Sequence, residues 1–127
     1  MTKTIIQTEH APAAIGAYSQ AVKVDKTVYV SGQIPLDPVS MTLVSDDFDG
    51  QTHQVFKNLA AVAKAAGGSL ADAVKLTVYV TDLGNFSRLN DIMGEYCEKP
   101  YPARAAVQVS ALPKGALVEI DAVLCLS

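Results

Sequence analysis

The sequence contains no tryptophan and only two cysteines and two histidines. Cys97 and Cys125 lie far apart and form no CxxC or CxxH pattern, so we expect free, buried thiols. His10 and His53 have no cysteine or carboxylate partner at ligand spacing. No metal site is therefore predicted, because protein zinc sites need several such ligands together.

Clustered positive charge is also missing from the chain. The ten lysines and arginines are scattered, the net charge is −3, and the Tyr and Phe residues do not interleave with basic ones. Nucleic-acid binding needs a concentrated positive face, often with stacking aromatics, so this partner is disfavoured. No stretch is long and apolar enough to span a membrane, and residues 1–7 do not resemble a signal peptide. We therefore expect a cytoplasmic protein with no membrane partner.

Apolar side chains, by contrast, are plentiful: 50% of the residues are hydrophobic and 18% are charged. The 127 residues suit one domain over 1–127 that buries its own core. A small domain this rich in apolar surface often covers part of it with copies of itself.

Hydrophobic periodicity predicts two helices and six strands. The helices are expected at 49–66, ended by Gly67, and at about 85–97. The strands are expected at 4–7, 21–24, 27–31, 74–80, 103–109 and 117–124. This order predicts an α+β fold in which a mixed sheet carries both helices on one face.

Alternation along the strands divides their side chains between the two faces of the sheet. One face is apolar and is expected to pack under the helices: Val74, Leu76, Val78, Val80, Ala103, Ala105, Val107, Val109, Val118, Ile120, Ala122 and Leu124. The other face is mixed: Tyr29, Ser31, Lys75, Thr77, Tyr79, Arg104, Ala106, Gln108, Glu119 and Asp121. We expect this mixed face to pack against another subunit and to keep polar pockets there.

Arg104 and Glu119 are the most informative pair on the mixed face. If strands 103–109 and 117–124 form a hairpin about the turn at 113–115, Arg104 and Glu119 are near neighbours. The pair could be a surface salt bridge, which would contribute little to stability. It could also be an anion site, because a guanidinium binds a carboxylate bidentately and a nearby glutamate can hold or deprotonate a water. The pattern alone leaves both open.

Several motifs occur along nearly the whole chain. The C-terminal ones are Pro102-Ala103-Arg104-Ala105-Ala106-Val107, Leu112-Pro113 and Val118-Glu119-Ile120. The others are Ala11-Pro12, Ala14-Ile15-Gly16, Tyr18-Ser19-Gln20, Val30-Ser31-Gly32-Gln33-Ile34-Pro35, Asn58-Leu59, Ala65-Ala66-Gly67, Val80-Thr81-Asp82-Leu83 and Phe86. In residue type, order and spacing this set resembles the signature of the RidA (YjgF) family of enamine/imine deaminases.

The resemblance implies a chorismate-mutase-like α+β fold and a homotrimer, in which three sheets form a central barrel with the helices outside and the sites lie between subunits. It also implies a reaction. Such proteins hydrolyse 2-imino acids such as 2-iminobutanoate and 2-iminopropanoate, and the corresponding enamines, to 2-oxo acids and ammonia. These compounds arise from pyridoxal-phosphate dehydratases, and no cofactor is implied for their hydrolysis.

The resemblance also implies site residues. By position, Arg104 matches the arginine that binds the substrate carboxylate, and Glu119 matches the residue that orients the attacking water. Tyr18 matches a site tyrosine that reaches across the interface. The remaining matches are Ser31 and Gly32, at a strand end lining the pocket, and Asn90, on a helix near the site.

The chain departs from the family pattern at a few positions. Ala17 stands where many relatives have Pro, and Ala106 stands where many active members have Cys, so only a backbone contact can survive there. Asp121 replaces a common Glu, and the connection from Asn90 to Arg104 is shorter than usual. Ala17 and Ala106 motivate an alternative, a non-catalytic trimer that binds small carboxylates or serves in stress-related interactions. A nuclease or translation inhibitor is disfavoured by the net negative charge.

Overall fold

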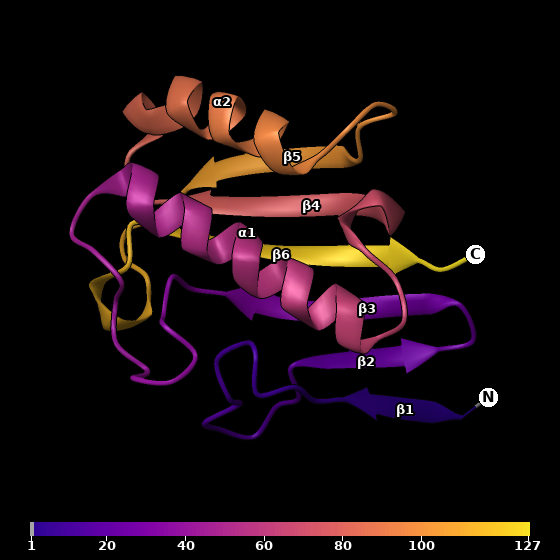
Figure 1. The fold of residues 1–127 in the computed structure, drawn as a ribbon. Coiled ribbons are helices and arrows are strands. Elements are labelled where there is room, and N and C mark those ends of the chain that lie inside the picture. Colours follow the sequence, from indigo (N-terminus) through magenta and orange to yellow (C-terminus); the bar gives the residue numbers. More distant parts are fainter. Residues whose placement is uncertain (1) are drawn as a thin grey trace.

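The computed structural model describes residues 2–127, which form one six-stranded sheet and two α-helices (Figure 1). The strands are β1 (Lys3–Ile6), β2 (Ala21–Val24), β3 (Thr27–Gln33), β4 (Ala73–Val80), β5 (Ala103–Gln108) and β6 (Val118–Cys125). The helices are α1 (Phe48–Ala65) and α2 (Phe86–Tyr96). Every predicted helix and strand is present, with ends shifted by at most about two residues, the usual scatter of such boundaries.

The strands lie in the order β1-β2-β3-β6-β4-β5. Strand β4 pairs in parallel with β5 and antiparallel with β6, so it separates the last two strands of the chain. The predicted hairpin of 103–109 with 117–124 is therefore wrong. Helix α2 forms a crossover that brings β5 back parallel to β4. The connection over 109–117 is also longer than the roughly two to five residues of an ordinary hairpin loop.

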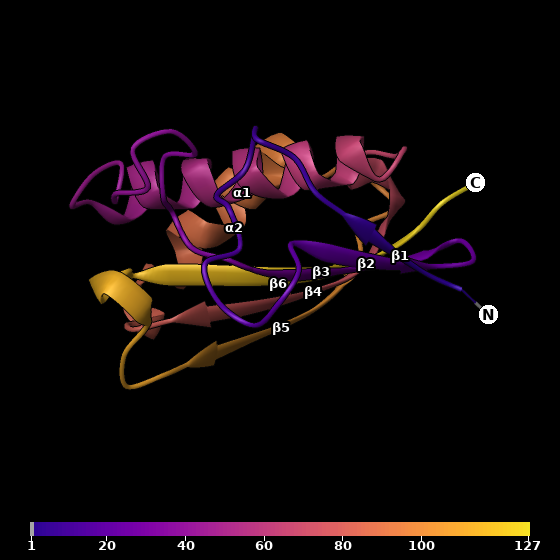
Figure 2. The ribbon, with the colours of Figure 1, turned by 90° about the horizontal axis from the view of Figure 1, so that it is seen from below.

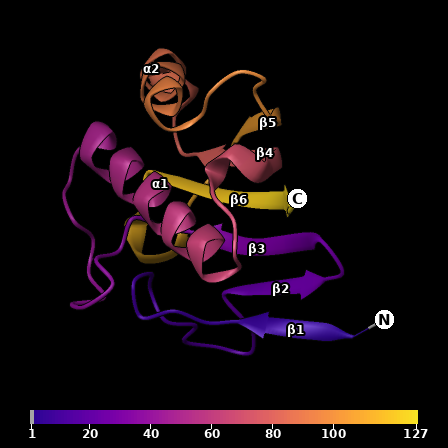
Figure 3. The same ribbon diagram turned by 45° about the vertical axis from the view of Figure 1, so that its right-hand side comes forward.

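Both helices cover the same face of the sheet, as predicted, and residues 2–127 leave the other face uncovered (Figure 2). Helix α1 packs diagonally across β6 and β3, and α2 lies beside it toward the β4–β5 side (Figures 1 and 3). Buried apolar side chains from both layers fill the space between them. Each large one contributes about 1.5–3 kcal/mol of burial free energy, so this layer fixes how the helices sit on the sheet.

The side chains of β5 face the opposite way from the prediction. Arg104 pairs with Leu76 and Ala106 with Val78, and both partners on β4 are fully buried beneath the helices. Arg104, Ala106 and Gln108 therefore face the helix layer, while Val107, on the uncovered side, is 43% exposed. Apolar character was a poor guide here because alanine, which dominates this edge strand, is tolerated on either face.

A second exception occurs at the start of β4. The pairing with β6 shifts between Ala73 and Lys75, which is the signature of a β-bulge. The extra residue turns Val74 outward, where it is 49% exposed, and Ala73 takes its place in the core. The predicted apolar row of β6 is confirmed, since its residues are all buried: Val118, Ile120, Ala122 and Leu124.

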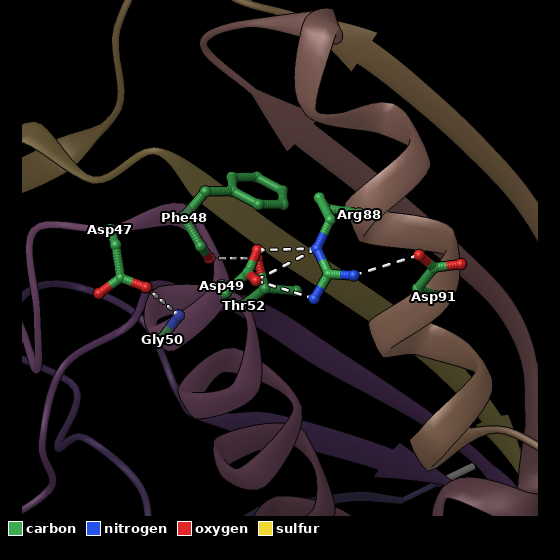
Figure 4. A network of polar contacts seen from close by, with 7 residues as sticks. All are labelled: Asp47, Phe48, Asp49, Gly50, Thr52, Arg88 and Asp91. Carbon is green, nitrogen blue, oxygen red and sulfur yellow. Dashed lines mark hydrogen bonds and ion pairs between the residues drawn. The ribbon is translucent and has the colours of Figure 1, made fainter.

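Polar contacts join the N-terminal end of α1 to α2 (Figure 4). The Asp47 carboxylate caps α1 by accepting a hydrogen bond from the Gly50 amide at 2.8 Å. Arg88 of α2 donates to Asp49 at 2.8 Å and to Asp91 at 3.2 Å. These three charged side chains are exposed, so their ion pairs orient α2 rather than supply much stability.

The predicted free thiols are confirmed, but only Cys97 is buried; Cys125 is exposed at the end of β6. Nδ1 of His53 lies 2.8 Å from the hydroxyl of Tyr96, so this histidine joins α1 to α2. Within residues 2–127 no group of three or more His, Cys, Asp or Glu side chains is arranged to hold a metal ion. No helix in this described part is long and apolar enough to cross a membrane.

Candidate active site

Glu119 lies against the backbone at the end of β3. The pairing of β3 with β6 is interrupted between Val30 and Gln33, so the chain bulges at Ser31 and Gly32. A Cβ atom added to Gly32 would meet the Glu119 carboxyl group, 2.9 Å from Cδ and 3.2 Å from Cγ. The glycine therefore leaves the room that the Glu119 side chain occupies, and a side chain at position 32 would displace the Glu119 carboxyl group.

The Glu119 carboxyl group is half-buried and, within the described chain, forms no ion pair or hydrogen bond. Burial raises its pKa above the ordinary glutamate value, and repulsion from Asp121 raises it further. Asp121 itself accepts a hydrogen bond from the hydroxyl of Tyr79 at 3.0 Å. A carboxyl group with a raised pKa and no partner is a stronger base than an exposed glutamate, as general base catalysis requires.

Ser31 holds a neighbouring loop rather than pointing into open space. Its hydroxyl donates to the carbonyl of Ser19 at 2.6 Å, and its amide donates to the carbonyl of Gln20 at 2.9 Å. Gln20 is buried, and its side-chain amide donates to the carbonyls of Thr8, Ala11 and Pro12. Together these contacts fix the loop that carries Tyr18 next to the end of β3. Sequence reasoning named Gln20 within a motif but did not predict that it anchors this loop, although a glutamine directly before an apolar strand was a visible signal.

Tyr18 is 52% exposed, and its hydroxyl accepts only a long hydrogen bond from the Ile15 amide, 3.4 Å. The ring lines the same hollow as Gly32. The structure therefore brings four of the predicted residues to one place at the end of β3: Tyr18, Ser31, Gly32 and Glu119.

Arg104 and Asn90 form a second group under α2. The Arg104 guanidinium lies 4.8 Å from the centre of the Phe86 ring, hydrogen-bonds to the Asn90 side-chain oxygen and approaches the Met93 sulfur at 3.7 Å. No carboxylate of residues 2–127 forms an ion pair with it. The hollow beside it is lined by Asn90, Met93, Gly94, Tyr101, Pro102 and Arg104. The group thus presents a positive charge, held by neutral side chains, to an open pocket.

Ala106 does not line that hollow, because its side chain packs against the core under the helices. Gln108, two residues further along β5, accepts a hydrogen bond from the Leu83 amide at 3.0 Å and so fixes the end of the strand. Sequence reasoning missed the roles of Phe86 and Met93, although both stand at helical spacing from Asn90.

Within one chain the two groups are far apart. Strand β4 lies between β5, which carries Arg104, and β6, which carries Glu119. Arg104 is level with Ala122 of β6, and Ala122 is three residues further along β6 than Glu119. With strands about 4.8 Å apart and a rise of about 3.4 Å per residue, the Cα atoms of Arg104 and Glu119 are roughly 14 Å apart. Their side chains also leave opposite faces of the sheet. The predicted neighbour pair is therefore wrong within a single chain.

Comparison with known proteins gives close matches over nearly the whole chain. The family model described as Endoribonuclease L-PSP matches residues 8–125. The 2-iminobutanoate/2-iminopropanoate deaminase of Rattus norvegicus is 50% identical over 121 residues, covering 95% of this chain and 88% of that protein.

Two solved structures show the same fold. RidA from the Antarctic bacterium Psychrobacter has a TM-score of 0.94 and 54% identity, covering 97% of this chain and 99% of its own. E. coli TdcF with bound serine has a TM-score of 0.92 and 37% identity, covering 98% and 99%. These matches, together with the motifs around Arg104 and Glu119, show that the chain belongs to the RidA (YjgF) family, whose model bears the description Endoribonuclease L-PSP.

Proposed function

We propose that this protein hydrolyses 2-imino acids, and the enamines in equilibrium with them, to 2-oxo acids and ammonia without a cofactor. The observation that carries the proposal is that one chain holds both an arginine and a half-buried Glu119 that have no ion-pair partner among residues 2–127. This chain is also 50% identical to a 2-iminobutanoate/2-iminopropanoate deaminase. We refer to the Arg104 group and the Glu119 group as the two half-sites.

Arg104 binds the substrate carboxylate in this scheme. Its guanidinium offers several N–H donors in a plane that fits a carboxylate, and Phe86 and Asn90 hold that plane without neutralising its charge. The serine bound to E. coli TdcF is an amino acid, which also carries a carboxylate beside a nitrogen-bearing carbon. Small 2-imino acids share that arrangement.

Glu119 acts as the base. Water adds to the carbon of the protonated imine while one proton of the water passes to the Glu119 carboxylate, and the C=N electron pair moves to nitrogen, which becomes a neutral amino group. Glu119 then returns that proton to the nitrogen. The C–N bond breaks and ammonia leaves, while the proton of the hydroxyl group passes back to the Glu119 carboxylate and the 2-oxo group forms. An imine carbon is already electrophilic, so correct placement of substrate and water supplies much of the rate increase. Tyr18 is placed to hold the water or to relay the proton.

A complete site needs both half-sites, which one chain keeps apart. We therefore propose that the site forms between subunits of a homotrimer, with Arg104 of one chain facing Glu119 of the next. The uncovered face of the sheet supplies a surface for that assembly, since Tyr29 and Val107 are both exposed there.

The test of the activity couples the purified protein to a threonine dehydratase and follows disappearance of the imine. Acceleration over the spontaneous rate is expected to rise with protein concentration and to be lost in Arg104→Ala while the oligomer persists. No acceleration at any protein concentration would refute the proposal.

Mixed oligomers test the placement of the site. Arg104→Ala and Glu119→Gln are each expected to be inactive, and mixing them should restore roughly a quarter of wild-type activity, the share of intact sites in a randomly mixed cyclic trimer. Two differently tagged Arg104→Ala chains serve as the control and should stay inactive. Failure of the mixed sample to recover activity, with subunit exchange shown by the tags, would place the site within one chain.

A second candidate is a non-catalytic protein that binds small carboxylates. It is favoured by Ala106, which packs in the core and offers no thiol to a substrate. Calorimetry with 2-oxo acids separates the two, because this candidate requires binding that depends on Arg104 without any turnover of imines. RNA cleavage that survives in Arg104→Ala after stringent purification would instead favour a nuclease.

A further inference from the structure

Asp121 and Tyr79 surround Glu119 on the uncovered face of the sheet. Glu119 and Asp121 are alternate residues of β6, so they share a face with Cα atoms about 6.8 Å apart. Tyr79 on β4 lies directly opposite Glu119 in the strand register. A tyrosine in that position could donate its hydroxyl to either carboxylate.

The Tyr79 hydroxyl is committed to Asp121. It donates to Oδ2 of Asp121 at 3.0 Å, so the contact runs diagonally from β4 to β6 rather than to the directly paired Glu119. The Glu119 side chain instead lies against Gly32 of β3. This hydrogen bond is the main reason that the pKa of Tyr79 is raised. Asp121 therefore has a donor and Glu119 has none, so the two carboxylates occupy different environments although they are neighbours on one strand.

Few other charges surround Glu119. The titratable groups on the same face of the neighbouring strands are Asp121 on β6, Tyr79 and Lys75 on β4, and Tyr29 on β3. Tyr18, on the adjoining loop, lines the hollow beside Gly32. Lys75 is the only cation of this set and is level with Val123, well along the strand from Glu119. Asp121 is thus the nearest fixed charge on the described chain, and it carries the sign that favours a proton on Glu119.

We infer that Asp121, held in place by the Tyr79 hydroxyl, is a positioning residue that makes Glu119 a stronger base in the reaction proposed above. This inference rests on the proposed function, but it concerns a residue that never touches the substrate. The Cα atoms of the two residues are about 7 Å apart, and the negative charge of Asp121 raises the pKa of the Glu119 carboxyl group in addition to the effect of burial.

The test compares the acid limb of the pH profile of kcat/KM in wild type, Asp121→Asn and Asp121→Glu. Asparagine can still accept the Tyr79 hydrogen bond, so this variant removes the charge and keeps the shape. Loss of the repulsion lets Glu119 stay ionised at lower pH, and the limb should move down by about 0.5–1 pH unit. Asp121→Glu keeps the charge, and its limb should stay near that of wild type. An unchanged limb in Asp121→Asn would overturn the inference.

A second measurement does not depend on turnover. The ¹³C carboxyl signal of Glu119, assigned by its absence in Glu119→Gln, should titrate at lower pH in Asp121→Asn than in wild type. A shifted signal in a protein without deaminase activity would support the effect of Asp121 on Glu119 and would refute the proposed function. An active enzyme with an unshifted signal would support the proposed function and refute the effect of Asp121 on Glu119. If Asp121→Asn fails to fold, the salt concentration is raised from about 0.01 to 1 M with the wild-type protein. The pH midpoint of the Glu119 titration must then fall, because salt screens the repulsion from Asp121. An unchanged midpoint would count against the inference.

Discussion

Gly32→Ala is the sharpest perturbation of the Glu119 half-site. The added methyl group would overlap the end of the Glu119 side chain, with Cδ at 2.9 Å and Cγ at 3.2 Å, so the carboxyl group must move. The backbone at Gly32 does not require a positive φ, and the effect is therefore steric alone. Overpacking of this kind costs about 1–3 kcal/mol when neighbours cannot relax, and less when a flexible side chain can swing away.

The assay measures stability and activity on the same samples. Urea unfolding at fixed protein concentration should show a loss of about 1 kcal/mol, because Glu119 can rotate toward solvent. Imine hydrolysis should fall by about 100-fold, because a catalytic group displaced by about 1 Å loses that much. The double variant Gly32→Ala/Glu119→Ala is the control. Without the glutamate the methyl group has room, so the two stability changes should not add.

Two results would refute this reasoning. Full activity in Gly32→Ala would show that the position of Glu119 does not matter to the reaction. Additive stability losses in the double variant would show that the methyl group and the Glu119 side chain do not compete for space.

Four further outcomes follow from other parts of the molecule. Asn58→Ala should cost about 1–3 kcal/mol by urea unfolding, because the buried Asn58 amide donates to two backbone carbonyls between β3 and α1. Gly94→Ala should raise the free energy of unfolding by up to about 1 kcal/mol, and Tm with it, because Ala favours the interior of α2 and a methyl group there meets nothing within 4 Å. Arg88→Ala should leave the unfolding midpoint nearly unchanged, as both partners are exposed. Glu119→Gln should be more stable than wild type at neutral pH, because it removes a half-buried negative charge. As the pH falls, the Glu119 carboxyl group of the native protein binds a proton at a higher pH than that of the unfolded chain. The difference in stability between the variant and wild type should therefore shrink as the pH falls through the raised pKa.

Elements were predictable from the sequence because their periodicity is local. The helix at 48–65 and the strand at 73–80 each carry a repeat that needs no knowledge of neighbours. Pairing was less predictable, since β6 pairs with β3 and β4, both distant in sequence, and not with β5, the strand just before it. The strand–helix–strand order around α2 favours a parallel pair with a crossover, and that rule should have outweighed the attraction of a hairpin between successive strands.

The sequence proposed residues for the candidate site but not their geometry. Residue types and spacing made Arg104 and Glu119 candidates, yet contacts such as Tyr79 with Asp121 depend on which strands become neighbours. Ser31 shows the same limit: its hydroxyl holds the Tyr18 loop, which a strand-end serine does not reveal from sequence.

The face on which Arg104 lies follows from α2 rather than from its own strand. In β5 both alternating rows are small or mixed, so apolar content does not decide which row is covered. One face of α2 carries Phe86, Asn90 and Met93, which recur at helical spacing. The amide of Asn90 lies between an aromatic and a thioether side chain and needs a hydrogen-bond partner beneath the helix. A guanidinium satisfies all three, by a cation–π contact, a hydrogen bond and a sulfur contact. Because that choice directs Arg104 toward the helices and Glu119 away from them, a site that uses both residues requires a second chain.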